Sequence, residues 1–181
     1  GSQEEDATRR DFTVNALSAD AAGRVYDYCG GLDDIAARRV RFIGDAGQRI
    51  AEDYLRILRF FRIHAAYGAG PTDRVALSAC IAGRKGLAAL SAERIRAEML
   101  KLLVAPRAAD ALQEMGDAGL LLDLLGGVAW HADFSAMVAL EQRLALPADS
   151  MRRLAALAVW IKEDAARLKQ RLRLSNAEHD R

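Results

Sequence analysis

An acidic and a basic side chain stand three residues apart in the stretch Arg49-Ile-Ala-Glu-Asp-Tyr-Leu-Arg56. Residues three apart on a helix share a face, so Asp53 and Arg56 would be presented together. A carboxylate only accepts hydrogen bonds and a guanidinium only donates them. Such a pair could recognise a planar ligand that offers a donor beside an acceptor. The same pattern is also typical of a solvated, salt-bridged helix face, which is the more frequent case for an isolated pattern.

The element that must position this pair is a helix predicted from Asp45 to Tyr67. Its apolar residues follow the spacing i, i+4, i+7, i+8 and i+11, which describes one face of an α-helix; they are Ile50, Tyr54, Ile57, Leu58 and Phe61. A polar stripe of mixed charge follows a second face and consists of Arg49, Glu52, Asp53, Arg56 and Arg59. The sequence therefore predicts one continuous amphipathic helix with the candidate pair on its polar face.

Composition places this helix in a mainly α-helical, globular protein. The chain has 181 residues, of which 51% are hydrophobic and 28% charged, enough for a core in one domain or two small ones. Three prolines, 6% aromatics and abundant Ala, Leu and Arg favour helix over sheet. A net charge of +1 neither requires nor excludes a nucleic-acid partner. No apolar run is long enough for a membrane span, and Cys29 and Cys80, without paired spacing, favour a reduced, cytoplasmic protein.

The remaining elements follow from breakers and periodicity. A small β-hairpin is expected near the N-terminus with its turn at Asp20–Gly23, followed by a short helix from Leu32 and a strand over Arg39–Ile43. Gly44-Asp45 should end that strand and cap the long helix. Beyond Pro71 the periodicity predicts helices at about 72–81, 83–88, 92–104, 107–116, 134–145, 150–162 and 164–172, with an apolar connector over 117–127 and a first helical turn after Leu174.

Four motifs occur in a fixed order over residues 9–121. They are Arg9-Arg-Asp-Phe-Thr-Val-Asn-Ala-Leu17, Asp27-Tyr-Cys-Gly-Gly-Leu-Asp-Asp-Ile35, Glu52-Asp-x-x-Arg56, and Ser91-x-Glu-Arg-Ile-x-x-Glu98 with a later Gly119-Leu-Leu. Together they resemble the class II CCA-adding tRNA nucleotidyltransferases and the bacterial poly(A) polymerases. Tyr28 and Cys29 depart from that pattern, which usually has a proline and an aromatic there, and this difference concerns only the packing of the hinge region.

The resemblance implies a domain layout and a reaction. Residues 1–67 would be the remainder of a head domain plus the nucleotide-selecting helix, and residues 68–181 a helical, RNA-binding neck and the start of a body. The family adds C and A from CTP and ATP to the 3′ end of tRNA, with Mg²⁺ held by a carboxylate pair. This chain begins after the family's amino-terminal motif, a Gly-rich loop with an Asp-x-Asp pair. We therefore expect a fragment of the enzyme that contains no catalytic residue and no metal ligand, and that is inactive alone.

The physical chemistry of the bases gives Asp53 and Arg56 their roles. Cytosine and adenine both present an amino donor beside a ring-nitrogen acceptor, and guanine and uracil present the reverse. Asp53 could accept the amino hydrogen while Arg56 donates to the ring nitrogen, so that G or U would leave buried polar groups unpaired. Glu52 would either orient Arg56 or form a structural salt bridge with it.

The resemblance also implies roles for other polar residues. Arg9, Arg10, Asp11 and Asn15 would contact the ribose and triphosphate, and Arg59 with Arg62 would add positive potential. The candidate RNA phosphate contacts are Arg84, Lys85, Arg94, Arg96, Arg152 and Arg153. Adjacent Asp33 and Asp34 are expected to pair locally. His64 and His131 are expected to be structural, and the dipeptide His179-Asp180 to be a chance resemblance to a metal motif.

Several functions remain open at this level. The closest alternatives are a poly(A) polymerase that uses ATP alone and an enzyme that adds only C. A non-catalytic RNA-binding helical module is an alternative from a different class. The expected partner in the leading hypothesis is the acceptor end of tRNA.

Overall fold

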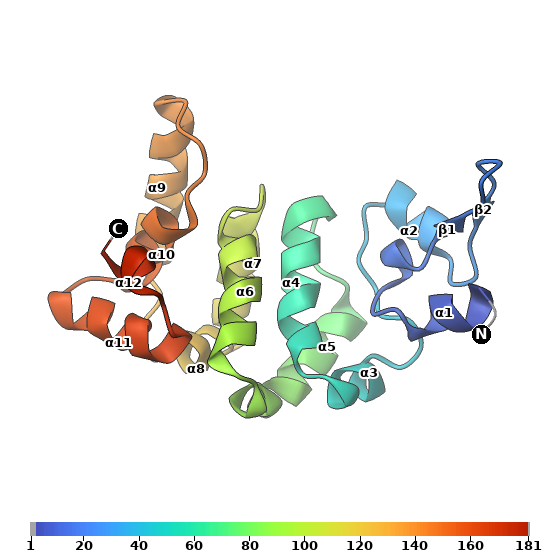
Figure 1. Ribbon diagram of the computed structural model, residues 1–181, viewed down its shortest axis with the longest axis horizontal. Coiled ribbons are helices and arrows are strands. Elements are labelled where there is room, and N and C mark those ends of the chain that lie inside the picture. Colours follow the sequence, from blue (N-terminus) through green and yellow to red (C-terminus); the bar gives the residue numbers. More distant parts are fainter. Residues whose placement is uncertain (1–2, 181) are drawn as a thin grey trace.

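A computed structural model describes residues 3–180 as a row of helices with one small hairpin near the N-terminus (Figure 1). The N-terminal part contains α1 (Gln3–Arg9), the 3₁₀ turn η1 (Thr13–Asn15), β1 (Ser18–Ala19), β2 (Val25–Tyr26) and α2 (Gly31–Ala36). The helices that follow are α3 (Ala46–Glu52), α4 (Leu55–Tyr67), α5 (Arg74–Gly83), the 3₁₀ helix η2 (Arg84–Ala89), α6 (Ala92–Leu103), α7 (Ala108–Asp117), α8 (Leu121–Leu125), α9 (His131–Arg143), α10 (Ser150–Ala158), α11 (Lys162–Leu172) and α12 (Asn176–His179). The predicted fold class, mainly α with a hairpin near the N-terminus, is confirmed.

The hairpin forms where it was predicted. β1 pairs antiparallel with β2, with Ser18 opposite Tyr26. The Asp20 carboxylate closes the turn by accepting hydrogen bonds from the backbone N–H groups of Ala22 (2.9 Å) and Arg24 (3.0 Å), and Gly23 supplies the positive φ of 79°. The turn chemistry of this segment was therefore sufficient to predict it.

The strand predicted over Arg39–Ile43 is wrong. This segment forms only an isolated antiparallel bridge, in which Phe42 lies opposite Phe12. Two backbone bonds make the bridge, from Thr13 N–H to the Arg41 carbonyl (3.1 Å) and from Ile43 N–H to the Asp11 carbonyl (3.2 Å). Pairing stops because the chain after Phe12 winds at once into η1 and offers no further extended backbone.

The single helix predicted from Asp45 to Tyr67 is also wrong, because it is broken at Asp53. Asp45 caps α3 as expected, by accepting the Gln48 N–H (2.7 Å). Asp53 has an extended backbone (φ −156°, ψ 106°), and its own carboxylate accepts the Leu55 N–H (3.1 Å). A short acidic side chain competes for backbone hydrogen bonds in this way, which favours a cap over a helix interior. Asp53 therefore lies at the joint between α3 and α4 instead of on a helix face.

Smaller differences concern helix ends. α1 and α8 were not predicted as helices; α8 is a single apolar turn between Gly119 and Gly126, both with positive φ. Its residues Leu121, Leu124 and Leu125 are buried as expected for the connector, whereas Leu122 is exposed. The region expected as a helix at 83–88 is the 3₁₀ helix η2. α10 ends at Ala158 instead of residue 162 because the chain becomes extended at Val159. The predicted cap at Ser91 forms, through the Arg94 N–H (3.4 Å), and Ser175 caps α12.

α4 is the centre of the molecule and joins the two ends of the row. It packs against α6 and α7 on one side, and the N-terminal part lies on its other side (Figure 1). Fully buried Phe60 contacts Phe42 (ring centroids 5.8 Å), which in turn contacts Phe12 (4.8 Å). This aromatic cluster fixes the residue after Asp11 against α4 and so holds Asp11 beside the joint at Asp53.

A buried ion pair fixes the other end of the row. Glu141 of α9 accepts a hydrogen bond from Arg153 of α10 (2.7 Å), whose second guanidinium nitrogen donates to the carbonyl of Leu103 in α6 (2.8 Å). Both side chains are more than 90% buried. The expectation that Arg153 contacts RNA is therefore wrong, because its charge is used inside the protein.

Within residues 3–180, every helix is too short or too polar to cross a bilayer. Both cysteines are free, and Cys80 is buried, which raises the pKa of its thiol to about 12. A cytoplasmic location and a domain boundary at residue 67 stay predictions.

Candidate nucleotide-selecting site

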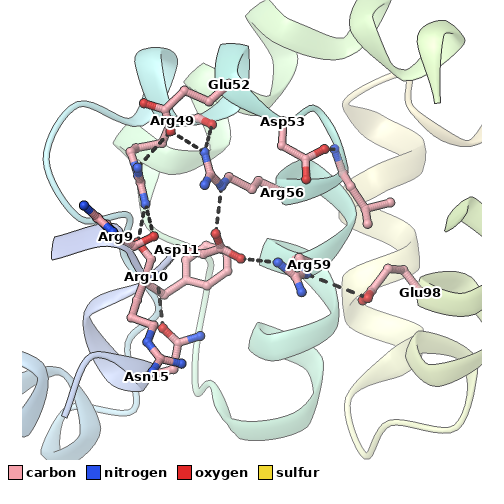
Figure 2. Close-up of polar contacts among 12 residues, drawn as sticks. Arg9, Arg10, Asp11, Asn15, Arg49, Glu52, Asp53, Arg56, Arg59 and Glu98 are labelled. Carbon is pink, nitrogen blue, oxygen red and sulfur yellow. Dashed lines mark hydrogen bonds and ion pairs between the residues drawn. The ribbon is translucent and has the colours of Figure 1, made fainter. Parts of the chain in front are cut away.

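The Asp11 carboxylate is the centre of the candidate site. One of its oxygens accepts a hydrogen bond from Arg56 Nε (2.7 Å) and the other from Arg59 Nη1 (2.6 Å), as Figure 2 shows. The Asp11 side chain is only 12% exposed, so both bonds are shielded from water and charge-assisted. Asp11 thus brings together two arginines that lie 45 and 48 residues further along the chain.

Arg49 and Glu52 hold Arg56 from the other side. Glu52 Oε2 accepts hydrogen bonds from Arg49 Nη1 (2.8 Å) and Arg56 Nη1 (2.6 Å). The carbonyl of Arg49, free because α3 ends, accepts a further bond from Arg56 Nη1 (2.6 Å). The salt bridge between Glu52 and Arg56 therefore has both roles expected for Glu52: it orients Arg56, and it connects α4 to α3. Within residues 3–180, Nη2 of Arg56 has no hydrogen-bond partner and remains available as a donor.

Asp53 is held in place by an arginine of α6. One carboxylate oxygen accepts the Leu55 N–H and the other accepts Nη2 of Arg94 (2.8 Å), and the side chain stays 29% exposed. Burial raises the pKa of Asp53, but these bonds and the nearby charge of Arg56 outweigh it and lower that pKa below its ordinary value. Asp53 is therefore ionised at neutral pH, acts only as an acceptor, and has lone pairs left for a ligand.

Arg49 also connects this joint to the segment Arg9-Arg10. Its Nη2 donates to the carbonyl of Arg9 (2.8 Å) and to that of Arg10. Arg10 pairs with Asp6 (2.8 Å), whereas the guanidinium of Arg9 is exposed, turned away from Asp11 in Figure 2, and without a partner in the described part of the chain. Asn15 accepts the Phe12 N–H (3.2 Å) through its oxygen, and its amide N–H groups have no hydrogen-bond partner among residues 3–180.

The whole groove between α4 and the N-terminal part carries surplus positive charge. Each of four carboxylates forms ion pairs with two arginines. These are Asp11 (Arg56, Arg59), Glu52 (Arg49, Arg56), Glu98 (Arg59, Arg62) and Asp34 (Arg39, Arg41). Six arginines thus share four acidic groups, and Arg9 adds a further cation. The side chains of Arg49 and Arg56 are only 14% and 13% exposed, so their charges attract an anion more strongly than surface charges do. The arrangement favours a ligand with several negative charges, such as a polyphosphate.

The other candidate RNA contacts fall into two groups. Arg84 and Lys85 are exposed on η2 and their side chains make no ion pair within residues 3–180. Arg96 donates to the Arg173 carbonyl (2.5 Å) and lies 3.4 Å from Glu178, and Arg152 pairs with Glu141 (2.7 Å). The exposed pair on η2 is therefore the part of this set that is available to a phosphate backbone.

The buried carboxylate of Asp34 is used in local hydrogen bonds and ion pairs. Asp34 is fully buried and accepts hydrogen bonds from the Thr13 hydroxyl (2.5 Å) and from Arg39 and Arg41, so it pairs locally as predicted. The described residues contain no group of three or more His, Cys, Asp or Glu side chains placed to hold a metal ion.

His64 has the structural role expected of it. His64 is buried against Gly70, whose carbonyl lies 3.2 Å from His64 Nε2, and burial lowers the pKa of its imidazole. His179 lies 3.1 Å from Asp180 on the exposed C-terminal turn.

Two residues that hold the site were not identified from the sequence alone. Arg49 was assigned only to the polar stripe, and Glu98 only to a motif. Glu98 is 94% buried and pairs with Arg62, 36 residues earlier. A buried acid needs a cationic partner, so its burial would have been the signal, but burial could not be predicted before the packing of α4 on α6 was known.

We expect acid to destabilise the fold below about pH 4.5. Burial raises the pKa of Asp34, but its bonds to Thr13, Arg41 and Arg39 lower that pKa overall, and arginine bonds lower that of Glu141 in the same way. A lowered native-state pKa gives stability that is complete above the ordinary values of 3.8 and 4.5 and is lost as pH falls further. Urea unfolding at pH 7, 4 and 3 measures this loss. Asp34→Asn should show a smaller loss than the wild type, and equal pH dependence of the two would contradict the assignment.

Comparisons with known proteins give a consistent result. The family described as the poly(A) polymerase head domain matches residues 1–41, and the family described as the probable RNA and SrmB-binding site of polymerase A matches residues 75–129. The chain is 36% identical over 177 residues to the mitochondrial CCA tRNA nucleotidyltransferase 1 of Danio rerio, covering 97% of this chain and 41% of that protein. It is 41% identical over 128 residues to the CCA-adding enzyme of Geobacillus thermodenitrificans, covering 69% and 31%.

A solved structure with the same arrangement of elements is the Bacillus stearothermophilus CCA-adding enzyme in complex with CTP. Its TM-score is 0.71 at 28% identity, and the match covers 99% of this chain and 45% of that one. The chain therefore spans less than half the length of the relatives it matches.

Proposed function

Since this chain belongs to the family of CCA-adding enzymes and poly(A) polymerases, we propose that it supplies nucleotide selection and RNA binding to the addition of C and A to the 3′ end of tRNA. The nucleotides would come from CTP and ATP. The observation that carries the proposal is that an acceptor and a donor near the joint between α3 and α4 are each held in place by other residues. Asp53 is an ionised acceptor held by Arg94, and Arg56 is a donor held by Asp11, Glu52 and the Arg49 carbonyl.

The choice of base would follow from the fixed positions of the acceptor Asp53 and the donor Arg56. Asp53 accepts the amino hydrogen of cytosine or adenine, and Nη2 of Arg56 donates to the adjacent ring nitrogen. A keto oxygen of guanine or uracil would instead face the Asp53 carboxylate, acceptor against acceptor. Neither protein group can rotate to adapt, because both are bonded to other residues. The protein itself would then act as the template.

The remaining polar groups of the groove suit the ribose and the phosphates. The free guanidinium of Arg9 and the shared charge of Arg59 would attract the triphosphate. Asp11 has both oxygens occupied by arginines, so its role would be to position Arg56 and Arg59. The free amide N–H of Asn15 is the better placed group for a ribose hydroxyl.

RNA would be gripped further along the chain. Arg84 and Lys85 are exposed on η2, inside the region that matches an RNA-binding family description. Unpaired cations at a surface bind a phosphate backbone without regard to sequence. The RNA bound there would be tRNA, which is named in the relatives, and the part bound would be its acceptor end.

The test is nucleotide binding by the chain itself. Titration with CTP, ATP, UTP and GTP in turn, at matched Mg²⁺ and salt, should give tighter binding for the first two. Equal dissociation constants for all four would contradict selection. A chain that binds RNA tightly but none of the nucleotides would instead be an RNA-binding module.

We expect the 181-residue chain to be inactive alone. Phosphoryl transfer in this family uses Mg²⁺, and residues 3–180 contain no group of three or more side chains placed to hold a metal ion. Incubation with CTP, ATP, Mg²⁺ and tRNA, followed by sizing of the tRNA at nucleotide resolution, should show no extension. A relative such as the Geobacillus enzyme serves as the positive control, and extension by the chain would show that it contains its own catalytic carboxylates.

A further inference from the structure

Two charged residues on one face of α6 contact separate parts of the candidate site. Arg94 and Glu98 are four residues apart, so they lie one turn from each other on the same side of the helix. Arg94 donates through Nη2 to the Asp53 carboxylate (2.8 Å). Glu98 pairs with Arg62 and lies 3.9 Å from Arg59, a contact that Figure 2 shows. α6 therefore fixes the base-selecting acceptor relative to the arginines further along α4.

The position of Arg94 is itself well defined. It lies in the first turn of α6, where its backbone N–H donates to the hydroxyl of the cap residue Ser91 (3.4 Å). The same helix is anchored in the core by Leu102 and Leu103, which are both buried. Arg94 is therefore presented to Asp53 from a rigid element and not from a loop.

The Asp53 carboxylate uses two partners to hold one orientation. One oxygen accepts the Leu55 N–H (3.1 Å). A carboxylate held through one oxygen alone can still turn about its last side-chain torsion, whose preferred range is broad. Arg94 holds the second oxygen. The two bonds together fix the plane of the carboxylate, and with it the direction of the lone pairs that remain for a ligand.

Arg94 also helps to keep Asp53 ionised. Burial raises the pKa of Asp53, but the Leu55 N–H, the bond and charge of Arg94, and the charge of Arg56 lower that pKa overall. A protonated carboxyl group donates as well as accepts, so it could bind the keto oxygen of guanine or uracil too. Discrimination between the bases therefore depends on the ionised carboxylate.

We propose that Arg94 is a positioning residue that determines base specificity, because it holds the Asp53 carboxylate in the orientation that accepts the amino group of cytosine or adenine. Arg94 acts through Asp53 and does not contact the base. The proposal rests on the proposed function, which gives Asp53 its selecting role. The Arg94 side chain is 47% exposed, and an ion pair this exposed contributes little to stability. Loss of Arg94 should therefore change selectivity while the fold is retained.

The test is the ratio of the dissociation constants of UTP and CTP for the 181-residue chain at pH 7, with matched Mg²⁺ and salt. Arg94→Met removes the guanidinium but keeps an unbranched side chain. It should lower the ratio about tenfold, the lower limit for a hydrogen bond to a charged group. Arg94→Lys keeps a positively charged donor and should recover part of the ratio. Lys101→Met removes an exposed charge from the same helix and, as the matched control, should keep the wild-type ratio. Urea unfolding of each variant verifies that the fold is retained.

A double variant shows whether Arg94 acts through Asp53. In the Asp53→Ala background, Arg94→Met should cause no further change in the ratio, because the group that Arg94 positions is gone. Additive effects would overturn the proposal and would indicate that Arg94 contacts the nucleotide itself. An unchanged ratio in Arg94→Met would also overturn it.

The same measurements separate this proposal from the proposed function. A wild-type chain without a preference for CTP refutes the proposed function. A selective wild type whose preference is lost in Asp53→Ala but kept in Arg94→Met refutes only the role of Arg94.

Discussion

Replacing Asp53 with alanine is expected to remove the preference of the chain for CTP and ATP over UTP and GTP. The variant loses the only acceptor of the pair, so cytosine and adenine lose a charge-assisted hydrogen bond, and the repulsion that disfavours guanine and uracil disappears. A hydrogen bond to a charged group contributes about 1.5–3 kcal/mol, which corresponds to roughly 10–150-fold in the ratio of dissociation constants. Titration of both proteins with the four nucleotides measures that ratio.

The controls for this experiment use the structure. Asp53 also accepts the Leu55 N–H and the Arg94 guanidinium, so Asp53→Ala should cost about 1 kcal/mol of stability through the lost cap. Asp53→Asn keeps an oxygen for Leu55 but adds an amide donor, and it should admit UTP and GTP without that loss. Asp33→Ala, an exposed carboxylate on α2, should leave selectivity unchanged. A selective Asp53→Ala protein would refute the templating role.

Glu141→Ala should be the most destabilising single change considered for this chain. It leaves the buried Arg153 guanidinium without its carboxylate, and Arg152 loses its partner as well. Removal of one member of a buried ion pair costs about 3–5 kcal/mol because an uncompensated charge stays in the interior. The free energy of unfolding from urea titration at pH 7 measures the loss.

A matched series separates the charge from the packing. Glu163→Ala removes an exposed acid of α11 and should change stability by less than about 0.5 kcal/mol. The double variant Glu141→Leu with Arg153→Met replaces the pair by apolar groups and should recover much of the loss. A double variant as unstable as Glu141→Ala would show that shape, and not the unpaired charge, sets the cost.

The sequence predicted the helices better than it predicted their ends. Periodicity identified the central helix through Ile57, Leu58 and Phe61, all of which are buried in α4. It could not reveal the break at Asp53, because the apolar spacing continues through Ile50 and Tyr54 on both sides of the joint. At the break, the Asp53 carboxylate accepts the Leu55 N–H and the Arg56 side chain donates to the Arg49 carbonyl, and no period in the sequence reports such contacts.

The contacts within the candidate site could also be predicted only in part. Motif order indicated that the segment around Asp11 and the segment around Arg56 belong together, and the structure places them in hydrogen-bond contact. It did not indicate Arg94 as the partner of Asp53, because the two are 41 residues apart and Arg94 was interpreted as an RNA contact. Partners of this kind are set by the packing of α6 on α4, which is a property of the folded chain.

The sharing of each carboxylate by two arginines has a thermodynamic consequence. A long, flexible side chain normally loses rotamer freedom when it binds, at about 0.5–1.5 kcal/mol for each one immobilised. Arg49, Arg56 and Arg59 are already immobilised by Glu52 and Asp11 before any ligand arrives. The conformational entropy of these side chains is lost during folding, before the nucleotide binds. We therefore expect nucleotide binding to show only a small unfavourable change in conformational entropy.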